Sequence, residues 1–288
     1  MQVAPSATEI SVVMPFRNAR STLAAAVRSI AGQTCHDWEL ILVDDGSTDD
    51  SVASIRSSLD DSRLRLISHR QCAGLPKRLN EAIAISRGRL VARMDADDVC
   101  LPERLERQRA YLRSHPEVCL VGAGVLVFDD TGRPLRVLQP PEQHQQLMRR
   151  AWSQILLPHP TWMGRIEWFR EHPYQEHARR AQDQCLLFEA RRDGRYACLP
   201  EVLLGYRGGL VDWRKSAAGR RNFVRSVRRH GTLGEWVLSC AYHAGAALYG
   251  AVLGRLLATR LRRHYHPVPP ALSDRWIRLW SELQVPDR

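Results

Sequence analysis

The chain has 288 residues, of which 44% are hydrophobic and 25% charged, which is typical of a globular protein and excludes a disordered or fibrous one. Its formal net charge of +11 favours a phosphorylated ligand, a nucleic acid or an anionic membrane as partner. The seven cysteines are odd in number and lack C-x-x-C spacing, so we expect reduced thiols in a cytoplasmic protein. The first ten residues do not resemble a secretory signal.

The first hundred residues alternate between apolar runs and helical patterns. The runs, rich in β-branched and other apolar residues, are 10–16, 38–45, 64–68 and 89–95, and the helical patterns between them are 21–33, 48–59 and 75–86. Unbroken apolar runs are typical of strands buried on both faces. The alternation predicts an α/β fold with a doubly wound, mostly parallel sheet. In such a sheet, ligands bind beyond the carboxyl ends of the strands.

The remaining chain carries less regular patterns. We expect a helix over 102–115, two strands within 118–138, a helix over 179–194 and a strand over 196–207. A basic block then spans 214–229, and a mostly small or apolar stretch spans 236–258. These features predict either peripheral contact with a membrane through 214–263 or a helix packed on the catalytic domain.

Acidic residues follow two of the predicted strands. Asp44 and Asp45 end the second run, whereas Asp95, Asp97 and Asp98 end the fourth. Clustered carboxylates repel one another unless a cation or a donor compensates them. A D-x-D pattern at this position therefore indicates a site for Mg²⁺ or Mn²⁺ that carries a phosphorylated ligand. We expect Asp98 only to cap the next helix.

An ordered series of segments resembles the family 2 inverting nucleotide-sugar glycosyltransferases, which have the GT-A fold. The segments are "SVVMPFRNA", "SIAGQTCHDWELILVDDGSTDDS", "GLPKRLNEAIAISRGRLVARMDADDVCLPERL", "HPTWM", "AQDQCLLFEA" and "LPEVLLGYR", and together they cover about 10–207. The resemblance implies a catalytic domain over 1–210, with a nucleotide-sugar half (about 8–100) and an acceptor half (about 101–210). Residues 211–288 would form a basic and apolar helical extension.

The resemblance also implies roles for residues on the donor side. Pro15 and Asn18 fall in the turn that lines the nucleotide, and Asp45 matches the acid that bonds the base. Arg78 and Asn80 lie in the segment that flanks the nucleotide. Asp95 matches the first acid of the D-x-D motif, near the ribose and the metal. Asp97 matches the direct metal ligand.

On the acceptor side, the resemblance implies that Asp183 is the general base. The family usually has an acid before this base, whereas this chain has Gln182. His159 is a candidate contact for the acceptor or the diphosphate, and Arg207 is a candidate partner for a phosphate. Both could equally be structural, His159 between prolines and Arg207 in a surface ion pair.

The implied activity is inverting transfer of a sugar from a nucleotide-sugar, with UDP favoured, to a hydroxyl group. The acceptor would be a glycan or a lipid-linked glycan in cell-surface polysaccharide synthesis, at the inner face of the membrane. No nucleic-acid partner is expected, because no RNA-binding motif is present.

Two alternatives stay open at this point. "DADDV" also fits the nucleophile motif of haloacid-dehalogenase-like phosphatases, with Asp95 as the nucleophile. The positive charge alone would also suit a non-enzymatic module that binds RNA or a membrane.

Overall fold

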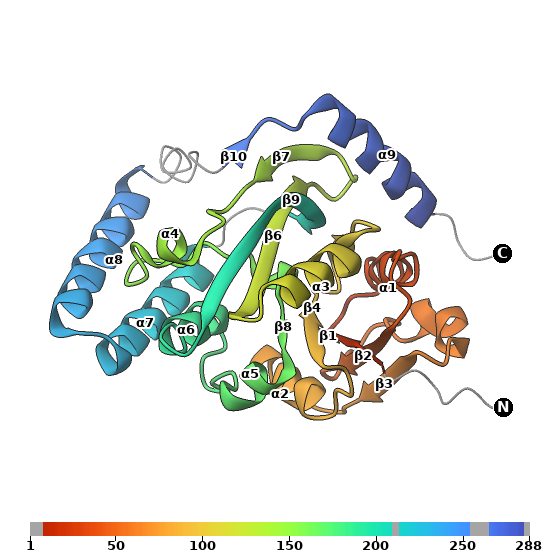
Figure 1. The fold of residues 1–288 in the computed structure, drawn as a ribbon, viewed down its shortest axis with the longest axis horizontal. Coiled ribbons are helices and arrows are strands. Elements are labelled where there is room, and N and C mark those ends of the chain that lie inside the picture. Colours follow the sequence, from red (N-terminus) through yellow and green to blue (C-terminus); the bar gives the residue numbers. More distant parts are fainter. Residues whose placement is uncertain (1–7, 209–212, 254–264, 285–288) are drawn as a thin grey trace.

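The computed structural model describes residues 8–208, 213–253 and 265–284. A curved mixed sheet crosses the molecule in the strand order β10-β7-β6-β8-β4-β1-β2-β3, and β9 pairs with β6 and β5 (Figure 1). The strands are β1 (Ile10–Phe16), β2 (Trp38–Asp44), β3 (Leu64–Ser68), β4 (Leu90–Arg93), β5 (Val99–Cys100), β6 (Val118–Phe128), β7 (Pro134–Leu138), β8 (Met163–Arg165), β9 (Arg195–Arg207) and β10 (Tyr265–His266).

Helices cover both faces of this sheet. They are α1 (Leu23–Ala31), α2 (Leu75–Ala84), α3 (Arg104–Ser114), α4 (His144–Met148), α5 (Ile166–Glu171), α6 (Gln182–Glu189), α7 (Trp213–His230), α8 (Leu233–Leu253) and α9 (Pro270–Gln284), with 3₁₀ turns η1 (Ala53–Asp60) and η2 (His159–Thr161). One core cluster includes Leu23, Val27 and Leu105, and the opposite one includes Leu79 and Phe169.

The N-terminal half confirms the predicted parallel sheet. β3, β2, β1 and β4 are all parallel, and every residue of β1, β2 and β4 is buried. Beyond β4 the sheet becomes mixed, because β8 pairs antiparallel with β4 and with β6. Because β8 is antiparallel to both, β4 and β6 run in the same direction. Strand β9 is parallel to β6, so its carboxyl end lies on the same side of the sheet as the carboxyl end of β4.

The segment 48–59, predicted to be a helix, is a loop followed by a 3₁₀ helix. Its first residues make a loop, and a 3₁₀ helix begins only at Ala53. The Asp44 carboxylate accepts the Ser47 N–H at 2.8 Å, and Asp49 accepts the Ser51 N–H at 3.0 Å. Such side-chain bonds to the local backbone compete with helix formation.

The C-terminal segment packs on two different parts of the fold. Helix α7 lies against α6, where Phe188 and Phe223 meet edge to face at 5.8 Å. Helix α8 forms the left edge of the view in Figure 1, whereas α9 crosses to the opposite end of the molecule. No described helix is both long and apolar enough to cross a bilayer. The boundary at residue 210 stays a prediction, and residues 254–263 of the predicted membrane segment lie outside the described residues.

Helix α9 is part of the core at that end. Trp276 is 1% exposed, its indole N–H donates to the Gly132 carbonyl at 2.7 Å, and its ring lies 4.7 Å from that of Phe128. A Cβ on Gly205 would lie 2.3 Å from the Trp276 ring, so this close approach requires glycine. The last helix is therefore fitted against β9 near its carboxyl end.

We predict that Trp276→Ala lowers the free energy of unfolding by about 3–5 kcal/mol, because a large buried ring would leave a cavity. Urea unfolding of the full chain measures this loss. Ile277→Ala is the matched control, since Ile277 is 51% exposed and its loss should cost less than about 0.5 kcal/mol. Equal stability of the Trp276 variant and wild type would show that α9 does not belong to the core.

Candidate functional site

The candidate site lies where the carboxyl ends of four strands converge. Asn18 follows β1, Asp45 follows β2, Asp95 follows β4, and Arg207 ends β9. The Arg207 N–H donates to Asp98 Oδ1 at 2.9 Å, which fixes the end of β9 against the loop after β4. Residues from distant parts of the chain therefore share one edge of the sheet.

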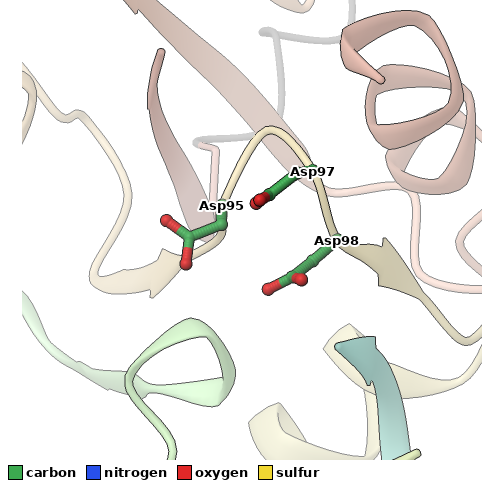
Figure 2. A group of neighbouring side chains, drawn as sticks. All are labelled: Asp95, Asp97 and Asp98. Carbon is green, nitrogen blue, oxygen red and sulfur yellow. The ribbon is translucent and has the colours of Figure 1, made fainter. Parts of the chain in front are cut away.

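Three carboxylates occupy the short loop between β4 and β5. Asp95, Asp97 and Asp98 each offer one oxygen, and these oxygens all lie within 4.8 Å of one another. Figure 2 shows Asp97 and Asp98 pointing toward the side of the loop on which Asp95 lies. Desolvation and the charge of Asp95 raise the pKa of Asp97, and burial raises the pKa of Asp98 well above its ordinary value.

The expected capping role of Asp98 is wrong. Helix α3 begins only at Arg104, and Asp98 is 1% exposed beneath the loop. Its Oδ1 accepts the Arg207 N–H, whereas its Oδ2 is buried without a hydrogen-bond partner among the described residues. An unpaired buried carboxylate oxygen is costly unless a cation or a donor meets it.

The acidic cluster fits a divalent cation. Mg²⁺ and Mn²⁺ take hard oxygen ligands, and Mg²⁺ is usually held by one or two carboxylates together with substrate phosphates. The grouped oxygens of Asp95, Asp97 and Asp98, together with the orphaned Oδ2 of Asp98, provide such ligands.

A buried arginine lies beneath the acidic cluster. Arg93, the last residue of β4, is 2% exposed and bonds both oxygens of Asp95, with one contact at 2.6 Å. Arg104, also fully buried, donates to the Arg93 carbonyl at 2.7 Å and so fixes the end of β4. From the sequence we predicted no role for either arginine. The charge of Arg93 within the apolar run 89–95 did indicate a buried ion pair, whereas no such pattern marks Arg104.

Arg207 lies on the other side of the cluster. Its Nε donates to the Asp97 carbonyl at 3.1 Å, and its guanidinium carbon lies 4.8 Å from the Phe128 ring centroid and 5.5 Å from that of Trp280. It also pairs with Asp130 at 3.3 Å. The aromatic rings hold this cation beside the acidic cluster, where it can attract a phosphate.

Asp45 organises the loop before α2. Its Oδ1 accepts from the Ala73 N–H and Arg78 Nε, both at 2.7 Å, and its Oδ2 accepts from the Gly74 N–H at 2.9 Å and Cys72 Sγ at 3.1 Å. Burial would raise the pKa of Asp45, but these donors hold it below its ordinary value. A base N–H would therefore be a fifth donor to this carboxylate.

Arg78 and Pro15 have their side chains enclosed by the protein. Arg78 is 5% exposed and bonds Asp45, Glu81 and the Gln71 carbonyl, so it fixes the loop. Pro15 is buried in β1 opposite Val43.

Asn18 ties two loops of the donor side together. It is exposed, and its Oδ1 accepts the Thr48 N–H at 2.8 Å. Its φ of 52° lies in the left-handed region, where non-glycine residues are uncommon. The turn after β1 therefore adopts a restricted conformation that its bonds to the turn after β2 maintain.

Asp183 lies in the first turn of α6. Burial raises the pKa of Asp183, whereas hydrogen bonds from Gln184 and, to a smaller extent, the charge of Arg93 act in the opposite direction. Ala181, the residue before the helix, has a φ of 56°; among the described non-glycine residues it shares positive φ only with Asn18. Backbone strain of this kind clusters at functional sites.

Tyr174 connects the two halves of the candidate site. Asn80 bonds the Tyr174 N–H and carbonyl, both at 2.8 Å, so Asn80 positions this residue. The Tyr174 hydroxyl lies 2.7 Å from His159 Nε2. Burial raises the pKa of this hydroxyl, and the charges of Asp183 and Asp95 act in the same direction.

The His159 side chain is buried rather than exposed to solvent. It is 8% exposed and its ring meets Trp162 edge to face at 4.6 Å. Burial and the charge of Arg93 lower its pKa well below the ordinary value, so the imidazole is neutral. The Arg93 charge thus reaches His159, Asp97 and Asp183 alike.

The fold, together with the residues at the carboxyl ends of its strands, defines a class of protein. A parallel half with an acidic loop after β4, joined to a half in which the sheet becomes mixed, is the GT-A arrangement of glycosyltransferases. The family model for glycosyl transferase family 2 matches residues 11–172. The chain belongs to glycosyltransferase family 2.

Individual relatives agree with this membership. The Bacillus subtilis protein EpsE is 39% identical over 136 residues, which cover 46% of this chain and 49% of EpsE. The Escherichia coli O-antigen biosynthesis glycosyltransferase WbnJ is 27% identical over 248 residues, covering 83% of this chain and 96% of WbnJ. The Staphylococcus aureus TarS 1-349 structure with UDP-GlcNAc has a TM-score of 0.63 at 17% identity, covering 96% of this chain and 80% of that one.

Family membership decides between the alternatives drawn from the sequence. It makes the chain an enzyme rather than only a charged binding module. It also removes the basis for a phosphatase in which Asp95 is the nucleophile. The Asp95 carboxylate is instead held by Arg93 through both of its oxygens.

We predict that Arg93→Met lowers the free energy of unfolding at pH 7 by about 3–5 kcal/mol, because it leaves Asp95 and its neighbours without their buried cation. The loss should be smaller near pH 4, since Asp97 and Asp98, whose pKa values the Arg93 charge lowers, would then take up protons. Urea unfolding at both pH values measures the difference. An equal loss at both would show that the arginine contributes by packing alone.

Proposed function

We propose that the protein transfers a sugar, with inversion, from a UDP-sugar to a hydroxyl group of a glycan or lipid-linked acceptor. The observation that supports this best is the group of carboxylate oxygens that Asp95, Asp97 and Asp98 bring within 4.8 Å of one another after β4. Arg93 bonds Asp95, and its charge also acts on Asp183, the candidate acid on the acceptor side. Direct displacement requires a donor-side acid and an acceptor-side acid around one anomeric carbon.

On the donor side, the loops after β1 and β2 would hold the nucleotide. Asn18 lies in the proposed nucleotide turn, whereas Pro15, expected in the same turn, is buried in β1 just before it. Arg78 and Asn80 fix the segments that flank the turn. Asp45 would accept the base N–H on a carboxylate that is kept ionised by its lowered pKa. Asp95 would face the ribose.

A divalent cation would be held chiefly by Asp97, with Asp95 and Asp98 beside it. Bound Mg²⁺ or Mn²⁺ would supply electrostatic stabilisation of the departing diphosphate. Arg207 adds a positive charge from this chain on the same side. We infer that Arg207 orients a phosphate oxygen, while the aromatic rings limit its movement.

On the acceptor side, Asp183 would take the proton from the attacking hydroxyl. An alcohol is a weak nucleophile, and a carboxylate within hydrogen-bond reach activates it as the new bond forms. A raised pKa makes this carboxylate a stronger base than an ordinary aspartate. His159, neutral and bonded to Tyr174, would help shape the acceptor side. One displacement inverts the anomeric carbon and needs no enzyme nucleophile, in contrast to a retaining glycosidase.

We propose a cytoplasmic location at the inner face of the membrane and a role in cell-surface polysaccharide synthesis. WbnJ, described as an O-antigen biosynthesis enzyme, supports the role because the match covers nearly its whole length. TarS, crystallised with UDP-GlcNAc, supports a UDP-sugar donor.

We predict that Asp97→Ala abolishes Mn²⁺-dependent binding of UDP-sugars, because it removes the central oxygen ligand. Thermal stabilisation by a panel of nucleotide-sugars, with and without Mn²⁺, identifies the donor and measures the loss. Unchanged Mn²⁺-dependent stabilisation of the variant would contradict the metal assignment.

We predict that Asp183→Asn keeps donor binding but lowers transfer about 10²–10⁴-fold, the usual contribution of a general base. Transfer to polyprenyl-diphosphate-linked glycans is followed with the donor that the panel selects. Asp193→Asn is the matched control, because Asp193 is an exposed carboxylate shortly after the same helix. Full transfer activity of Asp183→Asn would overturn the base assignment.

The pH dependence provides a separate test. Only the ionised form of Asp183 accepts a proton, so kcat should fall as pH decreases through a pKa raised above about 3.9, the value for unperturbed aspartate. The profile is measured at saturating donor, together with thermal stability over the same range. A kcat that is constant down to the ordinary aspartate pKa would contradict this role.

A further inference from the structure

Helix α8 turns an apolar face outward. Leu233 is 75% exposed, Val237 54%, Leu238 50% and Tyr242 45%. The other exposed residues of its described side chains are small: Gly234, Ala241, Ala244, Gly245 and Ala247. No charged side chain stands among these exposed positions over 233–247.

The polar residues of α8 face the protein instead. Glu235 pairs with Arg191 at 3.3 Å, Ser239 is 0% exposed, and the His243 ring packs against Phe223 at 5.7 Å. A helix on the surface of a water-exposed domain normally has the opposite polarity, with its polar residues outward. The amphipathic pattern of α8 is therefore inverted, and contiguous exposed apolar surface of this kind marks an interaction site.

One arginine of α7 lies at the margin of this face. The Arg228 guanidinium is 5.8 Å from the ring centroid of Trp236, in the first turn of α8. Arg221 is seven residues earlier, on the same face of α7, and the described structure gives neither arginine an ion pair. Arg225 and Arg229 are also exposed, but they line a cavity with Gln175 and His177 on another side of α7.

Tyr242 on this face also contacts a segment that follows two exposed arginines in the chain. The Tyr242 ring meets Trp152 edge to face at 6.0 Å, and Trp152 follows the exposed Arg149 and Arg150. An apolar helix face bordered by arginines is the pattern of a helix that lies in the interface of an anionic bilayer. Arginine side chains reach the phosphates while the apolar face enters the acyl boundary.

We propose that the outer face of α8, with Arg221 and Arg228 of α7, binds the surface of an anionic lipid bilayer. The sequence predicted contact somewhere within 214–263, whereas the structure assigns it to one face formed by 233–247. A second copy of the chain on this face is the alternative that the experiment distinguishes. The binding does not depend on the proposed glycosyl transfer.

Flotation of the full chain with vesicles tests this assignment. Wild type should float with vesicles that contain phosphatidylglycerol and much less with phosphatidylcholine alone, and added salt should weaken the binding. Val237→Glu together with Leu238→Glu should abolish flotation, and each of Arg221→Gln and Arg228→Gln should lower partitioning about fivefold.

Ile277→Glu is the matched control, because Ile277 is an exposed apolar residue on α9 and should leave flotation unchanged. Stabilisation by UDP-sugar with Mn²⁺ should be equal in all variants if they fold, which separates this proposal from the catalytic one. Failure of wild type to bind anionic vesicles would overturn it. So would sedimentation showing a wild-type dimer that Val237→Glu with Leu238→Glu converts to a monomer.

Discussion

The site depends on one buried guanidinium that compensates the carboxylates at the end of β4. Arg93 is held beneath the loop by Asp95 and by Arg104, which bonds its carbonyl. Clustered carboxylates in a partly desolvated loop repel one another and tend to protonate. With Arg93 below and Arg207 beside it, the loop keeps acids close enough for a cation while remaining folded.

The same cation relates the two halves of the protein. Its field reaches Asp97 on the donor side and Asp183 on α6, which comes ninety residues later in the chain. The charges of Asp183 and Asp95 both act on the Tyr174 hydroxyl, and Asn80 from α2 fixes the Tyr174 backbone. Asp97 itself is exposed on the loop after β4, so its placement depends on the bonds that Arg207 makes to this loop and that Arg104 makes to the end of β4.

The sequence predicted what local patterns encode. Apolar runs identified the parallel strands, and the strand ends identified Asp45, Asp95 and Asp97. What it missed depends on contacts between distant residues. Asp98 bonds Arg207, 109 positions away, and no local pattern distinguishes that role from a helix cap. For Asp45 the sequence predicted the position at a strand end. It did not predict the four donors that the loop before α2 and Arg78 in the first turn of α2 bring to this carboxylate.

The C-terminal helices connect the catalytic edge to the outer apolar face. Asn222 on α7 donates to the Arg180 carbonyl at 3.0 Å, and a Cβ on Gly219 would lie 3.5 Å from that of Ala181, so α7 contacts the strained turn before Asp183. Helix α8 packs on α7 through His243 and Phe223. A bilayer that received the face of α8 would therefore lie against a rigid stack, α8 on α7 on α6, whose innermost helix carries the proposed base. This arrangement would suit an acceptor whose lipid anchor stays in the membrane while its hydroxyl reaches Asp183.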